Sequence, residues 1–309
     1  PVSASFRIGA DENGLGSRLG PMVVTAVLAR VDERGARLLA RKLPAKLADM
    51  IGDSKQRVSH DNVALGEAWA RALVDPEFAS PAEVFGGLSL EGVERLRAPC
   101  PDHVRAQCWS IAGESFGADP GLVSAATRAR AELCRRGVEV LAVKSSVICT
   151  ERLNAARAAG KNRFVTDLHA MESLILAHRA QVDSDVVAIC GKVGGMGAYS
   201  RFFGPLGGRL HLVLDQRRER SAYRFPGVGE LHFVRDADAS DPLVMLASLV
   251  GKWVRELLMA RVGRWYEGAG LPSGYHDPVT ARFVEATALQ RKDRRVPDTC
   301  FERFRARSD

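Results

Sequence analysis

Short apolar runs recur along this chain and predict its strands. A mixed segment at 5–10 leads through a glycine-rich stretch into the β-branched run 22–31, a pattern typical of strand, turn and strand. Four later apolar runs predict further strands, at 138–143, 185–190, 211–215 and 230–235. The number of such runs indicates a sheet rather than an isolated hairpin.

Helical periodicity occupies most of the sequence between these runs. The segments that show it are 34–50, 62–74, 120–136, 163–181, 242–260 and 280–290. Small residues at Ala247, Ser248 and Gly251 would let one of these helices lie close to a sheet. Helices that alternate with strands are typical of a layered α/β core.

One stretch interrupts this alternation. Between 75 and 101 the periodicity is lost and Pro, Gly and Ser accumulate, which predicts an inserted segment at about 76–112. The sequence contains no internal repeat. We therefore expect a core over 1–260 that carries this insertion, followed by a helical C-terminal segment over 261–309.

Composition places the chain among soluble globular proteins, because 46% of its 309 residues are hydrophobic and 26% are charged. This excludes collagen-like, low-complexity and mainly disordered proteins. The 44 basic residues exceed the 37 acidic ones by 7, which favours a polyanionic partner without establishing one. Six widely spaced cysteines, no signal pattern and no apolar run near the roughly 20 residues of a membrane helix lead us to expect a reducing, cytoplasmic location.

The first candidate site is the pair Asp11 and Glu12, which ends the first predicted strand just before a glycine-rich turn. Mg²⁺ prefers carboxylate ligands, and glycines let a backbone approach a phosphate closely. Consecutive strand residues point to opposite faces, so both carboxylates can serve one metal only where the strand is ending. A solvated acidic turn is the alternative interpretation, because such pairs before glycine are common.

The wider motif resembles the opening of type 2 ribonuclease H (ribonuclease HII). Residues 9–16 match a strand that ends in Asp-Glu before a Gly-Arg-Gly turn, and residues 20–24 match the Gly-Pro and apolar strand that follow. Asp53-Ser54-Lys55 is similar to the family's Asp-Ser-Lys motif, which the resemblance implies helps to hold the nucleic-acid backbone. Taken alone, this tripeptide is equally typical of a polar loop.

Two later segments extend the resemblance toward the archaeal branch of the family. The segment that begins at Asp238, with its following helix, is similar to the family's Asp-Ala-x-x-Pro and Ala-Ser-x-x-x-Lys-x-x-Arg-Asp motifs, and this register selects Asp238 over Asp236 and Asp241. Residues 273–280 are similar to the archaeal Ser-Gly-Tyr and Asp-Pro-x-Thr motif. The resemblance implies that its tyrosine, Tyr275, packs on a sugar at the cleavage junction; without the family, Tyr275 would be a turn or core aromatic.

The resemblance implies a ribonuclease H-like α/β fold, with a mixed central sheet flanked by helices. It also implies two-metal hydrolysis of the RNA strand of an RNA/DNA hybrid, or cleavage at a ribonucleotide embedded in DNA, with Mg²⁺ or Mn²⁺. The metal ligands that it implies are Asp11, Glu12 and Asp238. The substrate-binding residues that we expect are Gly14, Leu15, Gly16, Ser54, Lys55, Lys192 and Tyr275.

Two departures from the family pattern bear on activity. The family's third carboxylate ends a central strand, and the matching strand here ends in Cys190, a neutral thiol that suits Mg²⁺ poorly. We therefore assign Cys190 to the catalytic position of the missing carboxylate. As a thiolate, Cys190 would bind a softer ion, but we favour the interpretation that it is a small buried residue. Leu15 replaces the turn arginine, so discrimination of RNA from DNA is expected to change.

Three other carboxylates could replace the missing ligand. Asp215 ends its own apolar strand and is the strongest of them, although Asp commonly ends strands without any such role. Asp185 begins its strand, roughly 16 Å from the other end. Glu219 lies in the charged stretch after Asp215.

The remaining polar clusters carry weaker signals. Lys192 lies in a glycine loop that could contact a phosphate or simply connect two elements. The basic and aromatic run 217–224 suits backbone neutralisation and base stacking, but most charge runs face solvent. Cys100, His103 and Cys108 lack a CxxC pair and a fourth ligand, so we do not expect zinc there. The sequence contains no nucleophile triad, zincin, P-loop or dinucleotide motif.

Two other hypotheses compete with the nuclease. One is a nucleic-acid-binding protein on the same fold that has lost efficient catalysis through Cys190. The other is a basic protein that shares the scaffold and binds a protein partner, since fold does not imply function. Asp11→Asn separates the first two, because only the enzyme loses turnover, and failure to bind a hybrid at low salt would favour the third.

Overall fold

The computed structural model describes residues 4–52, 62–75, 77–194 and 196–304, and its centre is one seven-stranded sheet. The strands are β1 (Ser5–Asn13), β2 (Met22–Val31), β3 (Val138–Ile148), β4 (Val186–Gly191), β5 (Leu212–Gln216), β6 (Arg220–Phe225) and β7 (Gly229–Val234). Their order is β3-β2-β1-β4-β7-β6-β5; the neighbouring pairs β1–β4 and β4–β7 are parallel, and every other neighbouring pair is antiparallel. The predicted mixed α/β sheet is confirmed.

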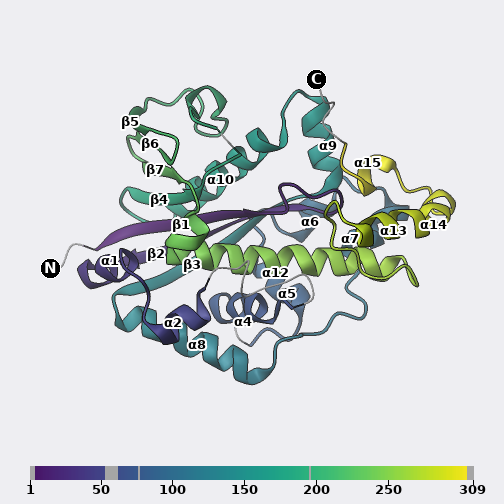
Figure 1. The fold of residues 1–309 in the computed structure, drawn as a ribbon, viewed down its shortest axis with the longest axis horizontal. Coiled ribbons are helices and arrows are strands. Elements are labelled where there is room, and N and C mark those ends of the chain that lie inside the picture. The colour runs from purple at the N-terminus through teal and green to yellow at the C-terminus, as the bar shows by residue number, and fades with distance from the viewer. Residues whose placement is uncertain (1–3, 53–61, 76, 195, 305–309) are drawn as a thin grey trace.

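Helices cover both faces of this sheet (Figure 1). Before β4 they are α1 (Glu33–Leu39), α2 (Ala45–Met50), α4 (Ala64–Leu73), α5 (Pro81–Leu88), α6 (Val93–Arg97), α7 (Asp102–Trp109), α8 (Pro120–Arg135), α9 (Thr150–Ala158) and α10 (Arg163–Arg179). After β4 they are the 3₁₀ turn η1 (Ser200–Phe202), α11 (Ala237–Ser240), α12 (Pro242–Trp265), α13 (Pro278–Ala286), α14 (Ala288–Asp293) and α15 (Asp298–Phe301). In Figure 1, α12 lies with α4, α5 and α8 on one side of the sheet, and α10 lies on the other.

The two sides of the sheet bury separate apolar clusters. Strand β2 contributes to both, because alternate strand residues face opposite ways: Val23 and Val27 pack with α12, whereas Val24 and Ala26 pack with α10. This two-sided burial explains why the run 22–31 is apolar at every position except Thr25 and Arg30. The core therefore fixes β1 and β2 between two helical layers.

Helix α12 approaches β1 closely because of one glycine. A Cβ atom at Gly9 would lie 2.4 Å from the backbone nitrogen of Val244 and 2.5 Å from the Cβ of Leu243. No larger residue fits there without a shift of the helix. The helix is thereby held along the strand that carries Asp11 and Glu12.

The structure differs from the sequence-based expectations in three places. The predicted helix 34–50 is divided into α1 and α2, with Pro44 at the start of α2. The segment 76–112 contains α5, α6 and α7, whose short length weakened the helical period. Strand β6 was missed, because its arginines suggested a solvated charge run although Tyr223 and Phe225 are buried.

The C-terminal helices pack on a third apolar cluster. Phe283 and Phe301 stack against each other and contact Tyr266, while Leu19 and Met259 complete the cluster. The expected boundary near residue 260 and the insertion at 76–112 stay predictions. Among the described residues, no helix is both long and apolar enough to cross a membrane.

Candidate active site

The carboxyl ends of parallel strands β1 and β4 bring the candidate acidic residues to one edge of the sheet. Ala10 pairs with Cys190, so the next residues, Asp11 and Gly191, are neighbours where the strands end. A Cβ atom at Gly191 would lie 2.9 Å from Asp11 Oδ1 and 3.4 Å from Glu12 Oε2. Oxygens of both carboxylates therefore converge over Gly191, as the interpretation of a shared site requires.

Asp11 is only 7% exposed, and its environment disfavours the charged form. Burial raises the pKa of Asp11 well above its ordinary value, and the negative charges of Glu12 and Asp238 raise it further. A hydrogen bond with the side chain of Ser248 on α12 acts in the opposite direction. The three predicted metal ligands thus lie within electrostatic range of one another.

The rivals of Asp238 have other roles in the structure. Asp241 caps α12, because its Oδ1 accepts hydrogen bonds from the backbone nitrogens of Leu243 (2.9 Å) and Val244 (3.1 Å). Asp236 has a left-handed backbone, with φ of 52°, and forms an ion pair with Arg235 at 3.6 Å. Only the charge of Asp238 acts on Asp11 among these three.

Strand β4 supplies no carboxylate to this edge. Cys190 is fully buried in the apolar cluster on the α10 side, together with Ala10, as the small buried residue that we favoured. Burial raises the pKa of the Cys190 thiol, which keeps it protonated and opposes metal binding as a thiolate. The residue that faces both carboxylates is Gly191, which carries no side chain at all.

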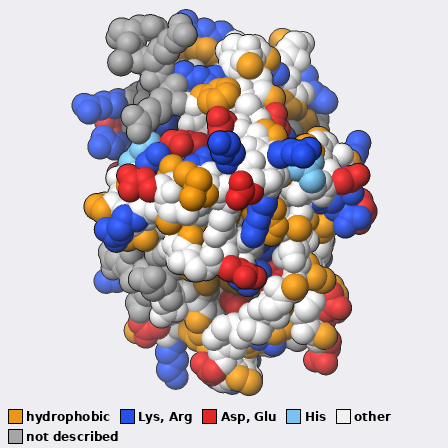
Figure 2. All heavy atoms as spheres, turned by 90° about the vertical axis from the view of Figure 1, so that its right-hand side faces the viewer, with side chains coloured by type: hydrophobic (Ala, Val, Ile, Leu, Met, Phe, Trp, Pro, Cys, Tyr) orange, Lys and Arg blue, Asp and Glu red, His pale blue; other side chains and the backbone are white. Residues whose placement is uncertain are grey.

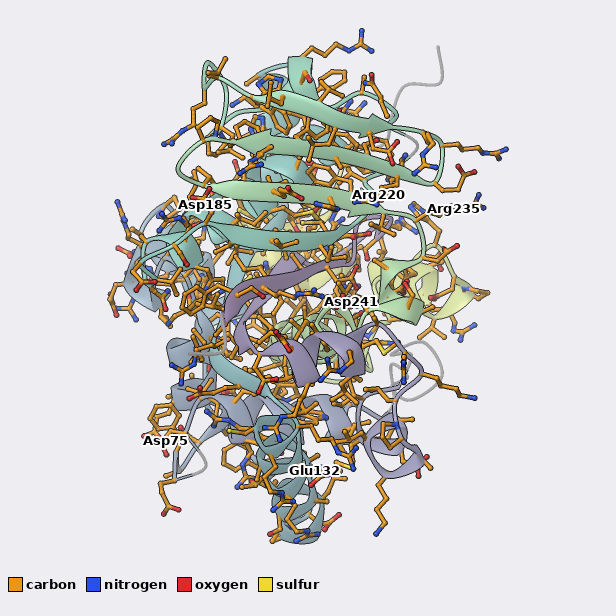
Figure 3. The ribbon with its side chains drawn as sticks, turned by 90° about the vertical axis from the view of Figure 1, so that its left-hand side faces the viewer. Asp75, Glu132, Asp185, Arg220, Arg235 and Asp241 are labelled. Atoms are coloured by element: carbon orange, nitrogen blue, oxygen red, sulfur yellow. The ribbon has the colours of Figure 1, made fainter. Side chains whose placement is uncertain are left out.

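The replacement carboxylates that we considered either have basic partners or are exposed to solvent. Figure 3 shows Asp185 at the opposite end of the strands from Asp241, and Asp185 lies 3.7 Å from Arg179. Asp215 accepts a hydrogen bond from Arg217 at 2.8 Å, which lowers its pKa, and Glu219 is exposed in the turn before β6. The sequence did not single out Asp167, a buried carboxyl on α10.

Two arginines far along the chain hold the glycine turn that follows Glu12. Arg303 donates to the carbonyl oxygens of Gly14 (2.6 Å), Leu15 (3.3 Å) and Gly20 (2.8 Å). Gly14 has a φ of 82°, and a Cβ there would lie 2.6 Å from Arg255 Nε. The turn is therefore shaped by contacts that only the tertiary fold provides, which is why both arginines were missed.

Arg255 also links this turn to the second predicted binding segment. Its Nη2 atom donates to Ser17 Oγ and to the Ser273 carbonyl, both at 3.0 Å, and its guanidinium lies 4.6 Å from the ring centre of Tyr275. Glu256 forms an ion pair with it. Tyr275 remains 43% exposed above this buried cation, in a position to stack on a ligand.

A groove of about 670 Å³ lies beside the glycine turn. Leu15 lines it together with four arginines and an aromatic ring: Arg18, Arg157, Arg163, Arg303 and Phe164. The Phe164 ring packs against Gly194, in the loop that follows β4, so the groove adjoins the strand ends. Across the face at the right of Figure 1, basic and acidic side chains are interspersed (Figure 2).

The other residues predicted to contact phosphate are Lys192, Ser54 and Lys55. Lys192 donates to the carbonyl oxygens of Arg217 (2.9 Å) and Arg218 (2.8 Å), so its ammonium group braces the turn between β5 and β6. Burial lowers its pKa. Ser54 and Lys55 lie outside the described residues. Phosphate binding by these three residues stays a prediction.

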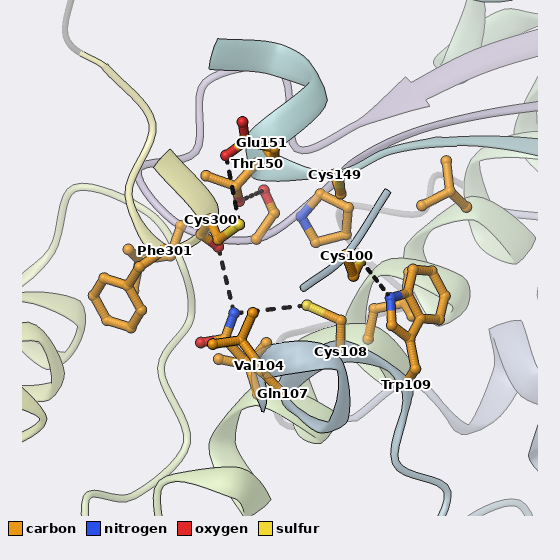
Figure 4. A pocket seen from close by; sticks show the side chains of 16 residues that line it. Cys100, Val104, Gln107, Cys108, Trp109, Cys149, Thr150, Glu151, Cys300 and Phe301 are labelled. Carbon is orange, nitrogen blue, oxygen red and sulfur yellow. Dashed lines mark hydrogen bonds between the residues drawn. The ribbon is translucent and has the colours of Figure 1, made fainter. Parts of the chain in front are cut away.

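Four cysteines from distant segments line a separate small pocket of about 50 Å³ (Figure 4). These are Cys100, Cys108, Cys149 and Cys300. His103 instead contacts the carbonyl oxygen of Arg295 at 3.1 Å. Burial raises the pKa of Cys108 to about 12, so this thiol stays protonated at neutral pH.

The similarity of this chain to known proteins lies in its fold. No protein-family model and no curated protein matches the sequence. Among solved structures, Bst ribonuclease HIII in complex with Mn²⁺ matches with a TM-score of 0.50 at 13% identity, over 97% of this chain and 66% of that chain. The chain has the type 2 ribonuclease H fold.

Two further similar structures have this type 2 ribonuclease H fold in full-length alignments. Archaeoglobus fulgidus ribonuclease HII, in a complex with PCNA, has a TM-score of 0.45 at 16% identity, over 98% of this chain and 96% of that chain. Ribonuclease H2 from Pyrococcus horikoshii has a TM-score of 0.47 at 15% identity, over 96% and 95%. The fold predicted from the sequence motifs is confirmed by the similarity to Bst ribonuclease HIII.

Proposed function

We propose that this chain is a ribonuclease HII-like endonuclease that hydrolyses the RNA strand of RNA/DNA hybrids or cuts at ribonucleotides embedded in DNA. One observation carries the proposal. The convergent pair Asp11 and Glu12 immediately precedes a turn that lines an arginine-rich groove. A reactive acidic pair beside a polycation groove suits a substrate that is a phosphodiester polyanion.

Asp11 and Glu12 fit a hard divalent cation, because Mg²⁺ is commonly held by one or two carboxylates together with water and substrate phosphates. Within the described part of the chain, no group of three His, Cys, Asp or Glu side chains is placed to hold a metal ion by itself. We therefore propose that this pair would hold Mg²⁺ or Mn²⁺, with the charge of Asp238 beside it and a substrate phosphate completing the site. When bound, such an ion supplies an activated water and stabilises the leaving oxygen.

The groove and the turn would bind and orient the substrate. Arg157 and Arg163 would neutralise backbone phosphates, and Tyr275 would pack on a sugar near the scissile bond. The carbonyl oxygens of Gly14 and Leu15 are already engaged by Arg303, so the backbone of the turn is rigid before substrate arrives. A rigid turn orients the scissile bond over the carboxylates without an ordering cost at that moment.

The test is cleavage of three labelled duplexes, each with Mg²⁺, Mn²⁺ or chelator. These are an RNA/DNA hybrid, a DNA duplex with one embedded ribonucleotide, and plain duplex DNA. We expect metal-dependent cutting of the first two only, and loss of that cutting in Asp11→Asn. Cutting that persists in chelator or in Asp11→Asn would refute the proposal.

A second function, nucleic-acid binding without efficient cleavage, is favoured by one specific observation. Strand β4 offers only a buried thiol at Cys190 and a bare backbone at Gly191, where the family resemblance calls for a carboxylate. A binder would retain salt-sensitive affinity for hybrids and cut none of the three duplexes. Binding of a protein partner instead would be indicated if no hybrid were bound even at low salt.

A further inference from the structure

Two acidic residues on α10 are completely buried, and within the described part of the chain only one of them has hydrogen-bond partners. Glu172 accepts hydrogen bonds from the backbone nitrogens of Gly204 (3.1 Å) and Leu206 (2.7 Å), which anchor the loop after η1. Asp167 is 0% exposed, and neither of its carboxyl oxygens has a hydrogen-bond partner among the described residues. A buried polar group without partners costs about 1–3 kcal/mol, so Asp167 has no evident benefit for the fold alone.

Asp167 lies behind the strand ends that carry the acidic pair. Burial raises its pKa well above the ordinary value, and the negative charge of Asp11 raises it further. Asp167 is also the acidic residue whose charge acts most on Cys190, and Cys190 faces the α10 side of the sheet. Asp167 therefore lies within electrostatic range of Asp11 and of the β4 position at which the sequence lacks a carboxylate.

At its last residue, strand β4 could carry a side chain only if a neighbouring carboxylate moved. A Cβ at Gly191 would already lie 2.9 Å from Asp11 Oδ1, closer than a side chain tolerates without a shift. Cys190 has a side chain directed to the α10 face, where Asp167 is the neighbouring acid. Strand β4 therefore has no carboxylate at this edge, whereas the facing helix α10 carries Asp167, which has no hydrogen-bond partner among the described residues.

We infer that Asp167 is a supporting carboxylate of this site, contributed by α10 from behind β4, which supplies none. This inference rests on the proposed function, because it assumes that a divalent cation binds at Asp11 and Glu12. Negative charge from Asp167 would stabilise that cation, and the cation would in turn offset the charge of a carboxylate that the protein leaves without hydrogen bonds. The negative charge that β4 does not supply then comes from α10, on the side of the sheet that buries Cys190.

The first experiment measures Mn²⁺ affinity of the intact chain by isothermal titration, without nucleic acid. We expect Asp167→Asn to weaken Mn²⁺ binding about 10- to 100-fold, the range typical of residues that support metal ligands. Glu172→Gln, the matched change of a buried acid on the same helix, should leave the affinity within about twofold of the wild-type value. Equal affinities for wild type and Asp167→Asn would overturn the inference.

The second experiment moves the carboxylate back to the strand. In the Asp167→Asn background, Cys190→Asp restores an acid on the α10 face of the sheet, near position 167, and should recover at least about tenfold of the lost Mn²⁺ affinity. If the double variant binds no more tightly than Asp167→Asn, the two positions are not equivalent and the inference fails. Thermal unfolding in chelator checks folding, and there Asp167→Asn should be at least as stable as wild type, because no hydrogen bond is lost.

Asp11→Asn separates this inference from the proposed function. If Asp11→Asn abolishes Mn²⁺ binding and Asp167→Asn does not change it, the inference alone fails. If wild type and Asp11→Asn bind Mn²⁺ equally, or neither binds, the metal site of the proposed function fails, and the inference fails with it.

Discussion

The two sides of the candidate site are built in opposite ways. On the side of the glycine turn, two cations have partners within the protein: the half-buried Arg303 donates to three carbonyl groups, and the buried Arg255 contacts a carboxylate, a hydroxyl and a carbonyl, although its Nε has no described partner. On the strand-end side, burial raises the pKa of both Asp11 and Asp167, and Asp167 lacks any described partner. The first side is completed by the protein itself, whereas the second is suited to a cation that the chain does not provide.

From this contrast we expect the largest loss of stability when a residue on the side of the glycine turn is replaced. Arg255→Met should lower the free energy of unfolding by about 3–5 kcal/mol, because it leaves Glu256 buried beside lost hydrogen bonds. Arg30→Met is the matched control, since the ion pair of Arg30 with Glu139 is exposed and should contribute about 0–1 kcal/mol. Urea unfolding measures both, and equal small losses would show that the turn is not held as described.

A second prediction concerns acid sensitivity of the core beneath the site. His178 is buried on α10 with Nε2 3.1 Å from the Ala26 carbonyl oxygen, and burial lowers its pKa to about 4. Its folded pKa lies below the unfolded value of 6.5, so its contribution is complete above pH 6.5 and is lost as pH falls toward 4. The loss should amount to about 3 kcal/mol.

His178→Gln should remove this part of the pH dependence. Unfolding of both proteins at pH 7 and pH 4.5 gives the comparison, in which wild type should lose more stability on acidification than the variant. A parallel loss in the two proteins would assign the acid sensitivity to other groups, such as the carboxylates at the strand ends.

The smallest expected effect concerns the groove. Arg163→Gln should weaken hybrid binding severalfold and reduce the slope of log affinity against log salt by about 1, because one phosphate contact is lost. Arg224→Gln is the control, since Arg224 is an exposed arginine on β6 outside the groove lining. Fluorescence anisotropy at several salt concentrations measures both, and a larger effect of Arg224→Gln would move the nucleic-acid interface to the 217–224 run.

The sequence could predict those parts of the site that depend on local order. Asp11 and Glu12 follow a short apolar strand and precede a glycine turn, so their place at a strand end was evident. Arg255, Arg303 and Asp167 could not be found this way, because their roles depend on contacts between segments distant in the chain. A buried acid inside an amphipathic helix carries no local signal of its own.

Errors in the fold have a similar origin. The arginines of 217–224 obscured strand β6, because Arg220 and Arg224 lie on either side of three consecutive buried residues, 221–223. Lys192 follows β4 in a glycine loop, as a phosphate ligand could, yet its ammonium group contacts two backbone carbonyls. A charged residue in a sequence indicates a polar environment, but the sequence alone does not identify the group that pairs with the charge.

The most direct test of the proposed function is single-turnover cleavage of a DNA duplex that contains one ribonucleotide, with enzyme in excess. Wild type and Asp11→Asn are compared in Mn²⁺, after anisotropy has shown that both bind the duplex equally. The account predicts cutting at the ribonucleotide by wild type and at least a 100-fold slower rate for Asp11→Asn, about 3 kcal/mol of lost transition-state stabilisation. Equal rates, or no cutting by fully bound wild type, would contradict it.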